Sequence, residues 1–123
     1  MSVVLDATVL IDVLRGDPSA VAYADSLDSI PVCSEVTRIE IVRGLRSEER
    51  RSAERLFAAI EWMALDEVIA RGAGELGRRW RKTHPGIGVA DLTVAATADE
   101  LRTTVATANV RHFPMFPDLE PPY

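Results

Sequence analysis

Residues 2–12 place the strongest constraint on how this chain can fold. Residues 3–5 are a short, unbroken run of valine and leucine, which is typical of a strand buried on both faces of a parallel sheet. Asp6 ends this run, and apolar residues then recur at helical spacing as far as Leu14. A buried strand that leads directly into a helix indicates an open α/β sheet. Asp6 would then lie where the first strand ends, which is where such sheets bind their ligands.

The rest of the chain continues to alternate between strands and helices. Apolar runs predict three further strands, at residues 30–33, 62–65 and 103–107. Segments of helical composition occupy residues 19–27, 34–45, 46–60, 66–83 and 89–101. We therefore expect a single domain over residues 1–123, of the α/β class, folded as a three-layer α/β/α sandwich around a mainly parallel sheet. The proline-rich tail from Arg111 is predicted to be irregular, with room for one short edge strand.

The distribution of charge points to local contacts with phosphate rather than to a basic surface. The net charge is −5, which argues against nucleic-acid binding by the molecule as a whole. One group of arginines, at residues 43–55, is interspersed with glutamates and is predicted to be a solvated helix face. A second group has fewer acidic neighbours and is predicted to be a basic patch; it consists of Arg78, Arg79, Arg81 and Lys82.

Cysteine content and hydropathy favour a cytoplasmic protein. Cys33 is the only cysteine, so no internal disulfide can form, and its apolar surroundings predict a buried structural thiol. No apolar run approaches the ~20 residues that a membrane-spanning helix needs. The first dozen residues contain no basic residue, unlike a signal peptide. We expect a reducing compartment and no membrane contact.

Polar residues that follow strands or begin helices form a candidate site. Asp6, Glu40, Asp91 and Asn109 are each expected at the same edge of a parallel sheet. Carboxylates that converge there would repel one another unless a cation lay among them, and oxygen ligands favour Mg²⁺ or Mn²⁺. Such an ion can hold a phosphate oxygen and activate a water molecule.

Each of these residues also has a simpler explanation. Either aspartate could cap a helix, and Asn109 could be a turn residue. Glu40 could complete a capping box with Thr37, or it could pair with Arg43 one turn later. Neither histidine has the spacing of a metal ligand.

Four ordered segments resemble the PIN domain, and more narrowly the VapC-type ribonuclease toxins of bacterial toxin–antitoxin pairs. They span residues 3–12, 37–44, 87–98 and 107–113. The resemblance implies a PIN-type sandwich and Mg²⁺- or Mn²⁺-dependent endonucleolytic cleavage of RNA. It also implies frequent homodimer formation and neutralisation by a small VapB-like antitoxin.

The resemblance assigns roles to individual residues. Asp6 and Asp91 match the metal-holding aspartates, Glu40 matches their acidic partner, and Asn109 matches the fourth polar position of the catalytic set. Hydroxyl positions often found beside the site are matched by Thr8 and Thr107. Many relatives carry a further acid at the position of Asn109 or three residues later, where this chain has His112. We therefore expect one tightly bound metal in the absence of RNA.

Two other functions compete with RNA hydrolysis. A phosphotransfer protein could use Asp6 as its phosphate acceptor, but such sites require a nearby lysine and usually a second aspartate. The only lysine is Lys82, and Thr8 stands where that aspartate would be. A non-catalytic binding module would predict a broken acidic set, whereas this set is largely intact. The hydrolase hypothesis also predicts an antitoxin helix in a groove between residues 9–14 and 39–45, with a basic side chain that reaches the carboxylates.

Overall fold

A parallel sheet of four strands forms the centre of the computed structural model, which describes residues 2–123. The spatial order of the strands is β3-β2-β1-β4, and every pairing is parallel. The strands are β1 (Val4–Leu5), β2 (Val32–Ser34), β3 (Glu61–Met63) and β4 (Val105–Ala106). All four predicted strands are confirmed, although each is shorter than its apolar run.

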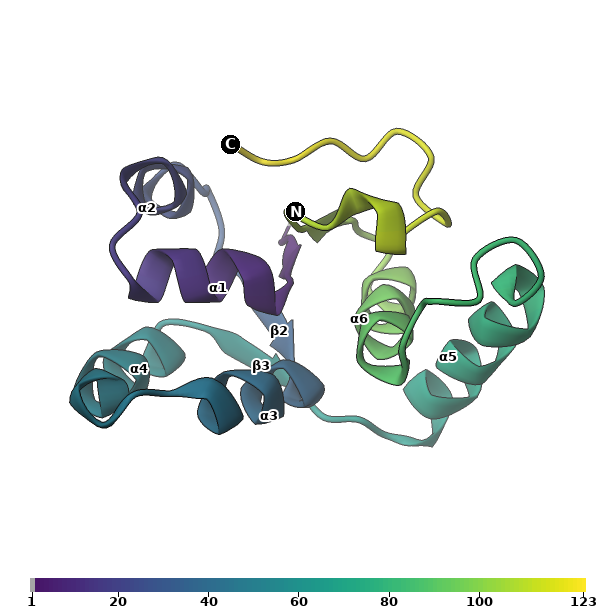
Figure 1. The fold of residues 1–123 in the computed structure, drawn as a ribbon, viewed down its shortest axis with the longest axis horizontal. Coiled ribbons are helices and arrows are strands. Elements are labelled where there is room, and N and C mark those ends of the chain that lie inside the picture. Colours follow the sequence, from purple (N-terminus) through teal and green to yellow (C-terminus); the bar gives the residue numbers. More distant parts are fainter. Residues whose placement is uncertain (1) are drawn as a thin grey trace.

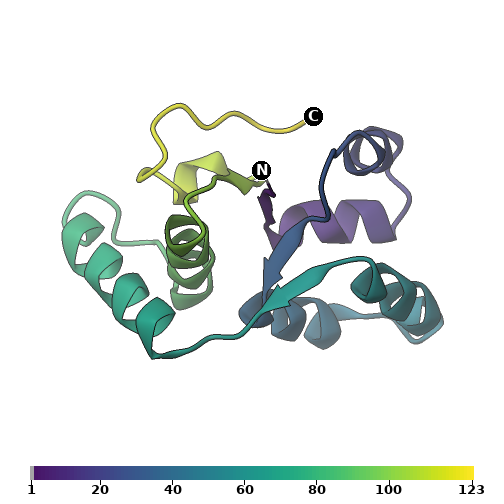
Figure 2. The same ribbon diagram turned by 180° about the vertical axis from the view of Figure 1, so that it is seen from behind.

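Helices cover both faces of this sheet. They are α1 (Ala7–Leu14), α2 (Pro18–Asp25), α3 (Glu35–Gly44), α4 (Arg50–Ala58), α5 (Glu67–Trp80) and α6 (Val89–Glu100). Figures 1 and 2 show α1 to α4 on one side of the strands and α5 and α6 on the other. This arrangement confirms the predicted α/β/α sandwich. None of the helices in residues 2–123 is long and apolar enough to cross a membrane.

Two of the predicted segments differ from the structure. The segment 46–60 is not one α-helix, because Arg46 is extended and a short 3₁₀ helix, η1 (Ser47–Glu49), precedes α4. The Glu49 carboxylate accepts the backbone N–H of Arg46 at 2.9 Å, which starts a new helical segment there. The tail contains a 3₁₀ helix, η2 (Val110–His112), and no strand is present in residues 107–123.

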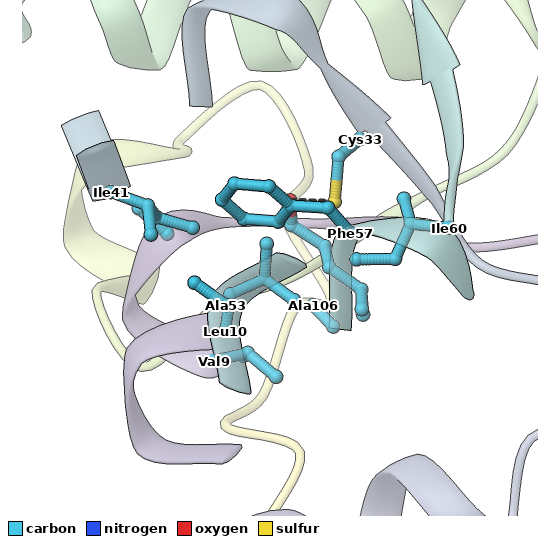
Figure 3. Packing of buried hydrophobic residues seen from close by; sticks show 10 residues of the cluster. Val9, Leu10, Cys33, Ile41, Ala53, Phe57, Ile60 and Ala106 are labelled. Carbon is cyan, nitrogen blue, oxygen red and sulfur yellow. Dashed lines mark hydrogen bonds between the residues drawn. The ribbon is translucent and has the colours of Figure 1, made fainter. Parts of the chain in front are cut away.

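The alternation of side chains along each strand builds two cores. Leu5, Cys33 and Ala106 face a cluster formed with α1, α3 and α4, in which Phe57 and Leu10 are prominent (Figure 3). Their neighbours on the same strands, such as Val4, face α6 on the opposite side. Burial on both faces explains why the strands are short apolar runs without polar alternation.

Cys33 is the buried structural thiol that the sequence predicts. It is completely inaccessible to solvent, and its Sγ donates to the carbonyl oxygen of Leu5 at 3.6 Å (Figure 3). Burial raises the pKa of the Cys33 thiol to about 12. The thiolate needed for nucleophilic chemistry is therefore scarce at neutral pH.

The C-terminal tail returns to the first two helices (Figure 1). The hydroxyl of Tyr123 donates to Oδ2 of Asp12 on α1 at 2.6 Å, and its ring centroid lies 6.0 Å from that of Tyr23 on α2. Tyr123 therefore holds the tail against α1, the helix that follows β1.

Candidate active site

Two hydroxyl groups hold Asp6 at the carboxyl end of β1. Its Oδ2 accepts hydrogen bonds from the hydroxyl of Thr8 at 3.0 Å and from that of Thr107 at 2.8 Å. Asp6 is 3% exposed and Thr107 is fully buried. The pairing of β1 with β4 aligns Leu5 with Ala106, and it brings Asp6 beside Thr107. Both predicted hydroxyls thus contact the predicted carboxylate.

The same hydroxyls also accept backbone hydrogen bonds from the loop after β4. The Thr107 hydroxyl accepts the N–H of Asn109 at 2.9 Å, and the Thr8 hydroxyl accepts the N–H of Ala108 at 3.1 Å. Asp6 occupies the N-cap position of α1, but its side chain makes no capping bond. The capping explanation therefore does not account for Asp6.

Glu40 lies on α3 with one carboxylate oxygen buried and unpaired. Ser34 caps this helix through its Oγ, which accepts the N–H of Val36 at 3.2 Å. Thr37 is therefore inside the helix, and the capping-box explanation for Glu40 is wrong. Among residues 2–123, Glu40 forms no ion pair with Arg43, and its Oε1 has no hydrogen-bond partner.

The environment of Glu40 disfavours its charged form. Burial raises the pKa of Glu40, and the negative charges of Asp6 and Asp91 raise it further, while Arg43 opposes them. The three carboxylates are therefore near enough for the two aspartates to act on the charge of Glu40. We call Asp6, Glu40 and Asp91 the carboxylate site.

Asp91 reaches this site from the first turn of α6, whose N-cap is Gly88. Its Oδ2 lies 2.8 Å from Nδ1 of His112 in η2. Burial raises the pKa of Asp91, the hydrogen bond from His112 lowers it, and the charge of Asp6 raises it. A position inside the first turn, rather than at the cap, leaves the carboxylate free to point toward Asp6 and Glu40.

The sequence matches the PIN domain family model over residues 3–116. This chain belongs to the PIN domain family. Ribonuclease VapC19 of Mycobacterium tuberculosis is 43% identical over 122 residues, which cover 97% of this chain and 98% of that protein. Ribonuclease VapC10 of the same organism is 42% identical, covering 98% of this chain and 92% of that protein. Because it is this similar to both relatives over nearly its whole length, the chain is a VapC-type PIN domain.

Solved structures show the same PIN fold. A toxin–antitoxin complex from Klebsiella pneumoniae contains a chain that superposes with a TM-score of 0.85 at 20% identity, covering 99% of this chain and 98% of that chain. VapBC-1 from nontypeable Haemophilus influenzae contains a chain with a TM-score of 0.77 at 24% identity, covering 98% of this chain and 96% of that one. At these identities the likeness concerns the fold.

The loop after β4 departs from the predicted site. The side chain of Asn109 is exposed and makes no hydrogen bond within residues 2–123, so the structure does not join it to the carboxylates. His112, to which no role was assigned, instead contacts Asp91. The signal that could have identified it was its position three residues after Asn109, where many PIN domains carry an acid.

The donor atoms of the carboxylate site fit a hard divalent cation. Glu40 has an unpaired buried oxygen, and burial together with the negative charges of Asp6 and Asp91 raises its pKa, so a cation among the three carboxylates would relieve their repulsion. No three His, Cys, Asp or Glu side chains within residues 2–123 are close enough to hold a metal together. Mg²⁺ suits this arrangement because it retains several waters and uses one or two carboxylates directly.

The geometry disfavours Asp6 as a phosphate acceptor. Oδ2 of Asp6 is occupied by two hydroxyl donors, and only 3% of the residue is exposed. Lys82, the only lysine, is exposed in the segment between α5 and α6. The phosphotransfer alternative would require an accessible carboxylate with a nearby cation.

Proposed function

We propose that this PIN domain is a metal-dependent endoribonuclease and the toxin of a type II toxin–antitoxin pair. The observation that carries the proposal is the unpaired, buried Oε1 of Glu40, in a site where burial and the charges of Asp6 and Asp91 raise the pKa of this carboxyl. Relatives named ribonucleases, at 43% and 42% identity, support the choice of RNA as the substrate. The protein would act in the cytoplasm, where its RNA substrate is found.

Asp6 and Asp91 would hold the metal, Mg²⁺ or alternatively Mn²⁺, with Glu40 bound directly or through a water. A bound divalent ion lowers the pKa of water and neutralises charge on the phosphate. The hydroxyls of Thr8 and Thr107 fix Oδ2 of Asp6, while His112 fixes Oδ2 of Asp91. Their Oδ1 atoms accept no hydrogen bond within residues 2–123 and are the natural ligands.

Glu40 is suited to accept the proton of the attacking water. Its Oε1 is buried and has no competing donor within residues 2–123, so it can accept the proton of a water that lies between it and the metal. The water oxygen forms a bond to phosphorus, its proton passes to Glu40, and the P–O3′ bond breaks. The products are a 5′-phosphate and a 3′-hydroxyl, which takes its proton from solvent. The exposed amide of Asn109 is available to the RNA at the edge of the site.

Replacement of the aspartates tests this proposal. Asp6→Asn and Asp91→Asn should each reduce RNA cleavage in Mg²⁺ by at least about 10²-fold, since each removes a charge that binds the metal. Asp118→Asn, in the exposed tail, is the matched control and should cleave at the wild-type rate. Sequencing the 5′ ends of fragments after brief expression would measure cleavage and identify the RNA. Wild-type rates in either site variant would show that the metal-site hypothesis is wrong.

The groove between α1 and α3 would receive the antitoxin. A cavity of about 60 Å³ lies there, with Ile11, Leu14 and Glu40 in its wall. An amphipathic helix could pack apolar side chains against Ile11 and Leu14 and pair a basic side chain with Glu40. Relatives of known structure are toxin–antitoxin complexes, which supports a partner of this kind.

A substitution at Gly44 tests the groove. A Cβ at Gly44, which lines the groove, would meet no atom within 4 Å, so Gly44→Phe should fold while filling the space for the helix. Gly74→Phe on α5 is the control, because a Cβ there is equally free. Co-purification with the antitoxin should be lost only for Gly44→Phe. Retention by both variants would place the antitoxin elsewhere.

The toxin is also proposed to form a homodimer. Ile39 and Val42 leave apolar surface uncovered on α3, with exposures of 65% and 48%. Packing of Ile39 and Val42 against a second copy of the chain would remove this apolar surface from water. Light scattering on the purified chain would measure the mass, and a monomer at all concentrations would contradict the proposal.

A further inference from the structure

A basic pocket lies between the end of α5 and the start of α6. Its volume is about 290 Å³, and Arg78, Arg81 and His84 line it together with the apolar residues Ile87 and Leu92. The arginines belong to the group that the sequence singled out as a basic patch. The pocket therefore combines guanidinium groups, which can bind a phosphate, with an apolar wall, which can contact a base. A nucleotide carries both of these groups.

The arginines of the pocket are available to a ligand. Within residues 2–123, Arg81 forms no ion pair. Arg78 lies 4.0 Å from Glu75, but both side chains are about 80% exposed, and such surface pairs are weak. Guanidinium groups in this state can bind a phosphate through two parallel hydrogen bonds.

The aromatic part of the pocket is held in place. The ring of His84 meets Trp80 edge to face, with centroids 5.5 Å apart, and its Nδ1 lies 2.9 Å from the hydroxyl of Thr83. Contacts on two sides restrict the rotation of the imidazole. A fixed aromatic ring beside cationic groups is how single-stranded nucleic acid is bound without sequence preference.

The pocket lies at the same end of α6 as the carboxylate site. Leu92 in its wall directly follows Asp91 at the start of this helix, and side chains of consecutive helical residues diverge by about 100°, so the two sites lie on neighbouring faces of α6. An RNA strand with its scissile phosphate at Asp91 could therefore reach the pocket with a neighbouring nucleotide. The net charge of −5 provides no general attraction for RNA, so a local cationic contact is required.

We propose that this pocket binds the nucleotide next to the scissile phosphate, with its phosphate on Arg78 and Arg81 and its base against His84. The inference rests on the proposed function, because it assumes that the substrate is single-stranded RNA. It assigns substrate positioning to the α5–α6 connection, which lies outside the carboxylate site.

Binding of a short fluorescein-labelled single-stranded RNA in EDTA, followed by anisotropy between about 50 and 200 mM KCl, tests the pocket. Each phosphate contact on a single strand contributes about 0.7 to the slope of log K against log salt, so R78A/R81A should lower that slope by about 1.4. R50A/R51A on α4, across the sheet from the pocket, is the matched control and should keep the wild-type slope (Figures 1 and 2). H84A should weaken binding at least about fivefold without changing the slope.

The outcomes separate the pocket from the proposed function. If the wild type cleaves RNA in Mg²⁺ and R78A/R81A keeps the wild-type slope, the pocket inference is overturned while the nuclease stands. If the slope falls as expected but the wild type cleaves no RNA with Mg²⁺ or Mn²⁺, the pocket stands and the nuclease fails. A glutamate-rich peptide that binds this pocket in place of RNA would overturn the inference and identify a protein-docking site.

Discussion

Replacing Thr107 with valine tests whether the hydroxyl pair is what holds the Asp6 carboxylate in place. Valine has the shape of threonine, so the fully buried position loses a hydroxyl without gaining a large cavity. Asp6 loses its 2.8 Å hydrogen bond, and hydrogen bonds to charged groups contribute about 1.5–3 kcal/mol. The N–H of Asn109 also loses its acceptor at 2.9 Å, which adds about 0.5–1.5 kcal/mol.

The sum predicts that Thr107→Val lowers the free energy of unfolding by about 2–4.5 kcal/mol, a large part of the 5–15 kcal/mol of a typical domain. Urea unfolding at neutral pH in EDTA would measure this change. Thr107→Ser keeps the hydroxyl and should lose much less.

Thr103→Val is a second control, since its hydroxyl donates only to the neutral carbonyl oxygen of Ser2, at 2.6 Å. We expect it to cost about 1 kcal/mol. A Thr107→Val protein within about 0.5 kcal/mol of wild type, or no more affected than Thr103→Val, would refute the charge-assisted role of Thr107.

Three further predictions concern single residues. Glu40→Gln should raise thermal stability in EDTA at pH 7. Because the pKa of Glu40 is raised in the folded protein, ionisation of this carboxyl lowers the stability of the wild type as the pH rises, and the glutamine variant avoids this loss. Calorimetry should therefore find the variant more stable at pH 7 and no more stable than the wild type below about pH 4, where Glu40 is protonated in both states. Asn109→Asp should strengthen Mg²⁺ binding without RNA in calorimetric titration, because it adds a charge; two tight Mg²⁺ sites in the wild type would contradict the one-metal expectation. Cys33 should react with a thiol reagent only as fast as the protein unfolds, because it is fully buried and its pKa is about 12; rapid labelling of the native protein would disprove this.

The features that were predictable from the sequence share a local origin. A strand that ends in Asp6, and a helix whose first turn carries Asp91, are recognisable in a few consecutive residues. Their convergence follows from the parallel sheet, because parallel strands end at the same edge. The role of the Thr8 and Thr107 hydroxyls was predicted from the family resemblance. The pairing of β1 with β4 explains why they contact Asp6.

The features that were missed depend on contacts between distant segments. His112 meets Asp91 from a 3₁₀ helix in a proline-rich tail, where no periodicity indicates which way a side chain points. The 3₁₀ helix η1 was hidden because residues on both sides of it favour α-helices. The capping box of Thr37 with Glu40 failed because β2 ends at Ser34, which caps α3 itself, and apolar runs define the end of a strand only to within a few residues.

The contact between Asp6 and Thr107 joins positions 101 residues apart, and this has a consequence for the order of events during protein synthesis. Asp6 is made almost first, yet its partner on the loop after β4 is made almost last. A chain that is still growing can form β1, β2 and β3, but β1 then has an unpaired edge and Asp6 lacks its buried donor. The carboxylate site is therefore completed only after nearly the whole chain has left the ribosome, which would keep an unfinished toxin from cutting RNA where it is being made.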